Sequence, residues 1–166
     1  MENKKQNYLT SILFSIYFLL LIWIILFKFS FSFEYGNHRS INLIPFGDSL
    51  IINGTLQLDE ILQNILIFIP FGIYICMLKP DWSFVKKVMP SFCTSLLVET
   101  FQYIFAMGAT DITDLIGNTL GGIIGIGVFY LFLKLFKEKT NKFINILAFS
   151  ATFIITSLLS FIVLLN

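Results

Sequence analysis

The feature that most constrains this 166-residue chain is a series of five long apolar segments separated by polar connections. A helix that crosses a lipid bilayer needs about 20 mostly apolar residues, and each segment has about that length. Hydrophobic residues make up 57% of the chain and charged residues only 13%, whereas soluble domains have about 45–50% and about 25%. We therefore predict an all-α, polytopic integral membrane protein that forms a single domain over residues 1–166. The five predicted transmembrane helices cover residues 8–29, 60–78, 86–107, 111–136 and 143–165.

The distribution of lysine and arginine predicts the orientation of these helices. Cytoplasmic connections of membrane proteins carry an excess of Lys and Arg. Nine of the eleven basic residues lie at the N-terminus or in the second-to-third and fourth-to-fifth connections, and only Lys28 and Arg39 fall on the other side. We therefore expect a cytoplasmic N-terminus and a C-terminus outside the cell. We expect the first segment to be retained as a helix, because its apolar run of about 20 residues exceeds the roughly 7–15 of a signal peptide.

Several acidic and amide residues interrupt the apolar segments near the side predicted to be external. A charge at the centre of a membrane helix costs on the order of 2.5–3.5 kcal/mol on insertion scales, so such residues need a reason to be there. Glu99 and Gln102 share one face of the third predicted helix at an i, i+3 spacing. Asp111, Asp114 and Asn118 form a stripe at the start of the fourth. Because a tight turn joins the two helices, we predict that both stripes contribute to one polar site that opens to the exterior.

Three further residues lie on the same predicted side of the membrane. Asn64 is early in the second helix, and Arg39 and Asn42 are in the long connection that precedes it. The NLIPF segment at Asn42–Phe46 is too short to span a bilayer and contains a proline. Irregular backbone at membrane depth is tolerated only where protein or water satisfies its polar groups. We expect this segment to be re-entrant or to lie in the interface, where it would cover the polar site as a lid.

Each of these polar residues also has a purely structural interpretation. Asp111 and Asp114 could cap the fourth helix, because carboxylates there accept backbone N–H bonds and interact favourably with the helix dipole. Asp114 lies deeper than a cap requires. Glu99 lies in mid-helix, where it is either functional, as intramembrane ionisable residues generally are, or a paired or protonated group that joins helices. The amides could equally join helices or contact a ligand.

Gly117, Gly121 and Gly125 recur at four-residue intervals in the fourth predicted helix. Small residues at this spacing let two helix backbones approach closely in a bilayer. We interpret the stripe as a packing surface and not as a ligand site.

The sequence offers few candidates for a metal or cofactor. Glu99, Asp111 and Asp114 could hold a divalent cation through carboxylate oxygens. Cys76 and Cys93 form no CxxC motif, and a zinc site therefore has no support. We predict no organic cofactor, and no nucleic-acid partner because there is no basic patch with interleaved aromatic residues. Membrane lipids are the expected partners.

Four motifs together resemble the VanZ family of small bacterial membrane proteins, over roughly residues 38–128. In chain order they are NLIPF at Asn42–Phe46, NILIFIPFG at Asn64–Gly72, Glu99-xx-Gln102, and Asp111-xx-Asp114-xxx-Asn118-xx-Gly121. The family commonly carries an arginine between the third and fourth motifs, where this chain has Gly108. Arg39 and His38 are the cations that could replace it.

The resemblance implies a cell-envelope protein of the bacterial cytoplasmic membrane, since the founding member of the family confers low-level resistance to the glycopeptide teicoplanin. One hypothesis is a binding module whose outer polar site engages a lipid-linked cell-wall intermediate or a lipoglycopeptide with a fatty-acyl tail. A second is an intramembrane enzyme that acts on a lipid phosphate or headgroup, with a divalent cation or a carboxylate as general base. A transporter is a weaker third reading, because the five segments show no internal repeat.

Overall fold

The computed structural model describes residues 2–27, 41–45, 51–52, 55–56, 58–105 and 110–165, which form five α-helices and four short strands. The helices are α1 (Glu2–Phe27), α2 (Leu58–Leu78), α3 (Phe84–Phe105), α4 (Ile112–Phe136) and α5 (Thr140–Leu165), with the 3₁₀ turn η2 (Lys137–Lys139) between the last two. The two-residue strands are β1 (Ile41–Asn42), β2 (Ile51–Ile52), β3 (Thr55–Leu56) and β4 (Thr110–Asp111). The helices lie where the apolar segments predicted them, although the first begins earlier, at Glu2.

Three stretches of the described residues are long and apolar enough to cross a membrane. They are Lys5–Leu26, Leu58–Leu78 and the 46-residue stretch Ile112–Ser157, which contains all of α4 and much of α5. The structure is therefore that of a helical membrane protein. These three stretches do not support the prediction of five transmembrane helices, because α3 is not among them and α4 and α5 fall within a single stretch.

The reason lies in the polar face of α3. Five of the six buried residues of this helix are polar: Lys87, Ser91, Ser95, Glu99 and Gln102. Its large apolar side chains point the other way, with Leu97 at 59% and Ile104 at 55% exposure. This arrangement is the reverse of a surface helix in a soluble protein, and it suits a helix that shows its apolar side to lipid.

Close packing between α2 and α4 positions the rest of the bundle. A Cβ atom on Gly125 would lie 2.0 Å from the carbonyl oxygen of Ile69, and one on Gly121 would lie 2.2 Å from that of Ile65. Only glycine allows the two backbones to approach this closely. The interpretation of the glycine stripe as a packing surface is confirmed.

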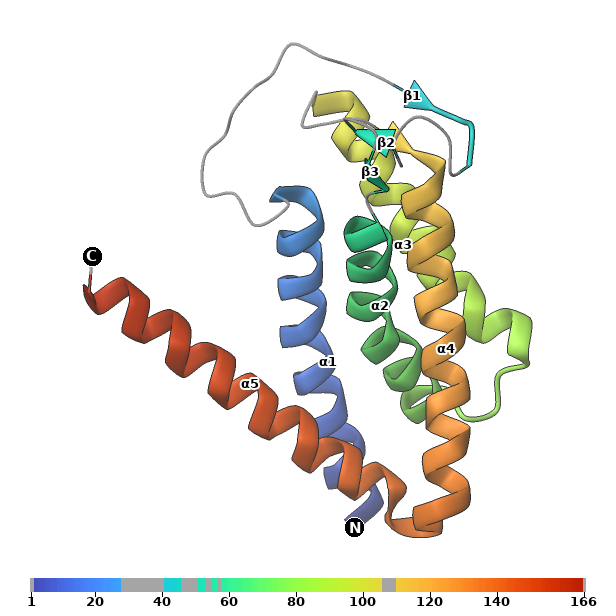
Figure 1. The fold of residues 1–166 in the computed structure, drawn as a ribbon. Coiled ribbons are helices and arrows are strands. Elements are labelled where there is room, and N and C mark those ends of the chain that lie inside the picture. Colours follow the sequence, from blue (N-terminus) through green and yellow to red (C-terminus); the bar gives the residue numbers. More distant parts are fainter. Residues whose placement is uncertain are drawn as a thin grey trace.

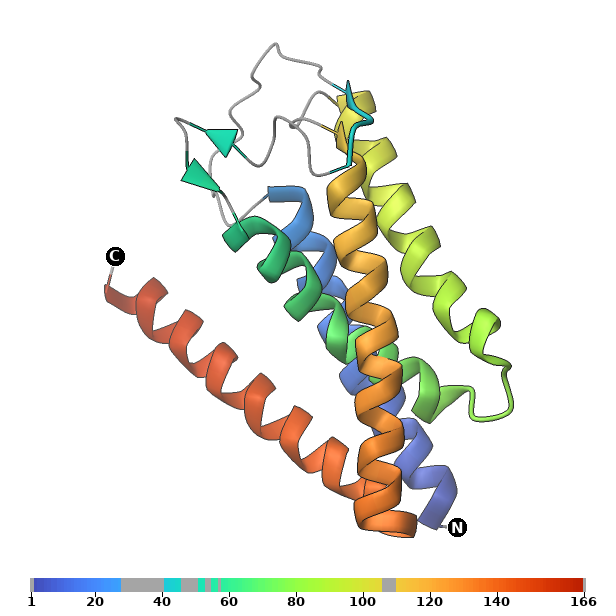
Figure 2. The same ribbon diagram turned by 45° about the vertical axis from the view of Figure 1, so that its right-hand side comes forward.

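The two ends of the bundle differ in what they carry (Figure 1). The N-terminus, the turn between α2 and α3, and the corner between α4 and α5 lie together at one end, which we call the lysine end. Strands β1 and β4 lie at the opposite end, which we call the strand end. Helix α5 diverges from the other helices as it leaves the lysine end (Figure 2). A buried pair joins it to α1 near that end, in which the Nδ2 of Asn145 donates to the Oγ1 of Thr10 at 2.9 Å.

Candidate functional site

At the strand end, the backbone pairing of β1 with β4 brings together residues that are far apart in the sequence. The two strands run parallel, with Ile41 opposite Thr110 and Asn42 opposite Asp111. The Nδ2 of Asn42 donates to the Oδ2 of Asp111 at 3.2 Å. The first residue of the NLIPF segment thus contacts the start of α4, and the role of the segment as a lid stays a prediction. The last residue of that segment lies outside the described residues.

Asp111 is the N-cap of α4. Its backbone is extended, with φ −122° and ψ 126°, and its Oδ1 accepts a hydrogen bond from the backbone N–H of Thr113 at 2.8 Å. The capping interpretation of Asp111 is therefore confirmed, but its contacts extend beyond the cap. Its own backbone N–H donates to the Oε2 of Glu99 at 3.1 Å. Glu99, which is 4% exposed, is thereby joined to the helix that follows it.

Two more hydrogen bonds continue the network along α4. The Nδ2 of Asn64, from α2, donates to the Oδ1 of Asp114 at 2.6 Å. One helical turn further along, the Nδ2 of Asn118 donates to the Oγ of Ser95, from α3, at 2.9 Å. Because α4 is flanked by both helices, its first two turns gather polar side chains from β1, α2 and α3. We call this group the acid–amide cluster, and it consists of Asn42, Asn64, Ser95, Glu99, Asp111, Asp114 and Asn118.

Gln102 departs from the predicted site. Its Nε2 donates to the backbone carbonyl of Ile25, in α1, at 3.0 Å. The i, i+3 spacing from Glu99 places Gln102 about 60° around the helix, which is enough to turn it toward another neighbour. Gln102 therefore joins α3 to α1, and the structure does not bring it into the acid–amide cluster.

The cluster is buried at its centre and half-buried at Asn42 and Asn64, and it is not fully hydrogen bonded. Glu99, Asp114 and Asn118 are 4%, 8% and 1% exposed. Within the part of the chain that the structure describes, the Oδ1 of Asn118 in the cluster and the Oε1 of Gln102 outside it have no hydrogen-bond partner. Buried polar atoms normally find a partner, so each of these acceptors could take a bond from a ligand or a water.

The remaining predicted site residue, Arg39, lies outside the described residues, as do His38 and Gly108. The predicted metal ligands Glu99, Asp111 and Asp114 are all described. In the described ranges, no group of three or more His, Cys, Asp or Glu side chains is arranged to hold a metal ion. The carboxylates of Asp111 and Asp114 instead accept from amide and backbone N–H groups. The divalent cation therefore stays a prediction.

Sequence reasoning treated Lys87 only as a charge that sets orientation and did not consider Ser91. Both are buried, at 2% and 0% exposure, and they continue the polar face of α3 toward the lysine end. The signal that could have found them is the four-residue spacing of positions 87, 91, 95 and 99, which places all four side chains on one helix face.

The chemistry available to the acid–amide cluster is that of hydrogen-bond recognition. Its carboxylates accept from neutral donors, and its amides offer both donors and acceptors. Leaving a buried polar group without a hydrogen bond costs free energy, so such a cluster disfavours a ligand that cannot pair with it. Carboxylate and amide oxygens pair with ligands that carry N–H and O–H groups.

Apolar helices that enclose a buried polar cluster define the chain as a small helical membrane protein. The VanZ/LLP1 family model matches residues 14–137. The chain is also 38% identical to Protein VanZ of Enterococcus faecium over 131 residues, which is 76% of this chain and 77% of that protein. The chain therefore belongs to the VanZ/LLP1 family, and the resemblance in its motifs is confirmed. No solved structure matches it.

Proposed function

We propose that this chain is a multi-pass protein of the bacterial cytoplasmic membrane that binds an outer-leaflet ligand through the acid–amide cluster. It has five transmembrane helices, a cytoplasmic N-terminus and an external C-terminus. The ligand is a lipid-linked cell-wall intermediate or a lipoglycopeptide, and binding contributes to resistance against teicoplanin.

The observation that carries this proposal is the convergence of β1, α2 and α3 on the first turns of α4. Four hydrogen bonds join these segments through Asn42, Asn64, Glu99 and Asn118. Side chains that served only to fasten neighbouring helices would have no reason to gather at one end of the molecule. The strand end is also the end remote from the lysine-bearing connections, and the excess of lysine favours a cytoplasmic location for those.

The chemistry of the ligand follows from the chemistry of the cluster. Peptide and sugar groups of cell-wall intermediates and of glycopeptides present many N–H and O–H donors, which carboxylate and amide oxygens accept. The acyl or polyprenyl part of such a ligand would lie in the bilayer beside the exposed apolar face of α3, where Phe101 and Ile104 are 50% and 55% exposed.

The enzyme hypothesis would need a cation to bind a lipid phosphate at the cluster. The described residues do not favour it over binding, since they hold no group of three potential metal ligands. It is tested separately by measuring divalent metal in the purified protein and in Asp114→Asn.

The proposed function is tested by expressing the chain in a teicoplanin-susceptible Gram-positive bacterium and measuring the minimal inhibitory concentration. We expect wild-type protein to raise it, and Glu99→Gln or Asp114→Asn to abolish the rise while leaving protein level and melting temperature near wild type. These substitutions change charge and keep shape, so they separate ligand binding from packing.

Thr100→Val is the matched control. Thr100 is next to Glu99 but is exposed, and its hydroxyl bonds only to the carbonyl of Leu96 in its own helix. We expect this variant to behave as wild type. An unchanged inhibitory concentration on wild-type expression would remove the resistance role, and full activity of both cluster variants would remove the site.

A further inference from the structure

The lysine end holds a buried ammonium group that the proposed function does not use. Lys87 is 2% exposed, and its Nζ donates to the carbonyl of Pro80 and to the hydroxyl of Tyr130, each at 2.9 Å. The same nitrogen lies 5.3 Å from the centre of the Tyr130 ring. No carboxylate among the described residues forms an ion pair with it. A buried charge is costly unless an opposite charge compensates it.

A pocket of about 380 Å³ borders this ammonium, between the α2–α3 turn and the α4–α5 corner. Its volume is in the range of about 300–1,000 Å³ that is usual for small-molecule sites. Its polar lining includes a second lysine, Lys137, the amides of Asn7 and Asn141, and one carboxylate, Glu138. The lining residues on which the proposal rests are Lys87, Tyr130, Lys137 and Asn141. We call it the lysine pocket.

The backbone of the lysine pocket is strained at one of these residues. Lys137 has φ 50° and ψ −124°, and it is the one described non-glycine residue with a positive φ. Its N–H bonds to the carbonyl of Leu133 and closes the end of α4. Non-glycine residues held in such conformations cluster at ligand sites, where the surrounding structure compensates for the strain.

We propose that the lysine pocket binds a terminal phosphate group, supplied by a lipid headgroup or by free phosphate. An ammonium has three N–H donors, and Lys87 uses two of them on neutral oxygens, so the third is left for a phosphate oxygen. Lys137 supplies a second positive charge and Asn141 an amide donor. The site is independent of the acid–amide cluster, because the two share no residue and lie at opposite ends of the bundle.

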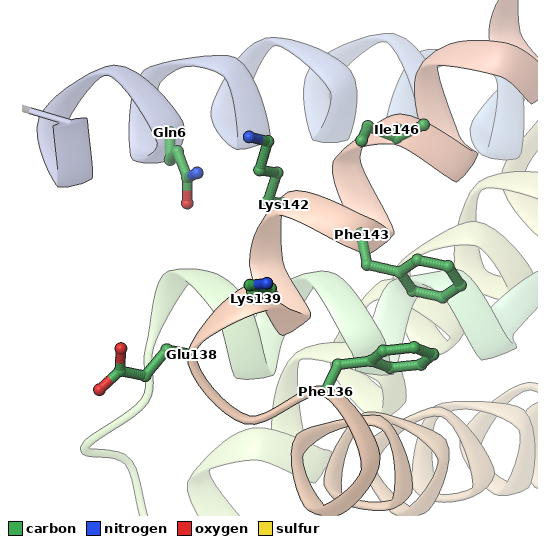
Figure 3. Close-up of a pocket in the computed structure, with 7 residues that line it drawn as sticks. All are labelled: Gln6, Phe136, Glu138, Lys139, Lys142, Phe143 and Ile146. Carbon is green, nitrogen blue, oxygen red and sulfur yellow. The ribbon is translucent and has the colours of Figure 1, made fainter.

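A neighbouring pocket shows why the buried lysine matters. Figure 3 shows the residues that line this larger pocket, which lies beside η2 and the start of α5, with Lys139 and Lys142 on one side and Gln6 of α1 opposite. Its volume is about 940 Å³. Both lysines are exposed, so water and salt screen their charges and they attract anions only weakly. Glu138 is exposed and borders both pockets, and it therefore does not distinguish them.

The test uses the full chain purified in a maltoside detergent, with two pairs of probes. Dioleoyl phosphatidic acid is compared with dioleoylglycerol, which has the same acyl chains and no phosphate. Inorganic phosphate is compared with chloride at equal ionic strength. The readouts are the rise in melting temperature and the number of lipid molecules retained in native mass spectrometry.

The variants are Lys87→Met and Lys137→Met, with Lys142→Met as the control from the larger neighbouring pocket. Methionine keeps much of the apolar stem of lysine and removes its charge. We expect wild type and Lys142→Met to bind the phosphate-bearing probe. Lys87→Met should bind it about tenfold more weakly or worse, the loss of one hydrogen bond to a charged group. Lys137→Met should lose a smaller but measurable part of the binding, because the exposed ammonium of Lys137 is screened by water and salt. Stabilisation by inorganic phosphate identifies a free-phosphate site, and stabilisation by phosphatidic acid alone identifies a lipid headgroup site.

The proposal is overturned if wild type prefers neither phosphate-bearing probe to its partner, or if both pocket variants respond as wild type does. Lys87→Met could fail to fold, since Lys87 also holds the α2–α3 turn. Lys137 is exposed, so replacing it should not prevent folding, and Lys137→Met then decides the test. Weaker binding of the phosphate-bearing probe by this variant supports the site, and unchanged binding overturns the proposal. Because teicoplanin susceptibility is not a readout here, failure of this proposal leaves the proposed function untouched.

Discussion

The two ends of α3 both bury a charged side chain, but they compensate for it in different ways. Lys87 and Glu99 lie on one helix face, three steps of four residues apart, which is about 18 Å along the axis. At the strand end, Glu99 accepts from the backbone N–H of Asp111, within a network that reaches β1 and α2. At the lysine end, Lys87 donates to the carbonyl of Pro80 in the nearby turn and to the hydroxyl of Tyr130 in α4, and a pocket lies beside it.

This difference is the basis for proposing opposite kinds of ligand at the two ends. The strand end presents carboxylates and amides held by neutral donors, which favours a ligand that donates hydrogen bonds. The lysine end presents ammonium groups beside open volume, which favours an anion. At both ends α3 packs against α4, so the position of α4 determines the geometry of the acid–amide cluster and of the lysine pocket.

The largest effect is expected from moving α4. In Gly125→Ala, the new Cβ would meet the carbonyl oxygen of Ile69 at 2.0 Å, and α4 must shift away from α2. We expect a loss of about 1–3 kcal/mol or more in the free energy of unfolding, as for other overpacked interiors. The measurement is SDS-induced unfolding in mixed micelles, followed by circular dichroism.

Gly127→Ala is the matched control, since a Cβ there would have no atom within 4 Å. Alanine is intrinsically better than glycine in a helix by about 1 kcal/mol, so the control should be neutral or slightly stabilised. If Gly125→Ala unfolds like the control, the packing of α4 on α2 does not hold the two ends in place.

A smaller effect, limited to the strand end, is expected from the bond between Asn64 and Asp114. A double-mutant cycle with Asn64→Ala and Asp114→Ala should give a coupling of about 1–2 kcal/mol, because the amide contacts a buried carboxylate at 2.6 Å. The measurement is again SDS-induced unfolding, now of wild type, both single variants and the double variant. A coupling near zero would mean that the network at the strand end is no stronger than ordinary helix packing.

Much of this organisation could be predicted from local patterns in the sequence. The helix positions follow from apolar length, the cap from an aspartate at the start of a helix, and the packing surface of α4 from glycine spacing, although the spacing did not identify α2 as the partner. Each of these signals depends on residues within one or two turns of each other. The grouping of Glu99 with Asp111 could be predicted for a similar reason, because a short turn joins their helices.

The rest depends on tertiary packing that no local pattern contains. Gln102 carries the same signal as Glu99, yet α1 and not α4 supplies its partner. Hydropathy does not distinguish a lysine at a membrane edge from a buried one, so Lys87 was interpreted only as a topology signal. The polar face by which α3 packs against the bundle also lowers the mean hydropathy of this helix, which helps to explain why length and composition support fewer spans than predicted.

The smallest effect is expected at the rim of the strand end, where β1 meets β4. Asn42→Ala removes the bond to the Oδ2 of Asp111 and the turn in which the Oδ1 of Asn42 accepts from the N–H of Ile44. Because Asn42 is only half-buried, water replaces part of what is lost, and we expect a decrease of about 0.5–1 kcal/mol in the free energy of unfolding. The measurement is melting temperature together with hydrogen exchange of the Thr110 and Asp111 amides, which should become less protected.

Leu43→Ala is the control, since Leu43 is 69% exposed and its substitution should leave both quantities unchanged. The lysine end offers an internal reference, because its amides near Lys87 should exchange at the wild-type rate in both variants. Equal loss of protection at the two ends would show that β1 stabilises the whole bundle and not only the acid–amide cluster.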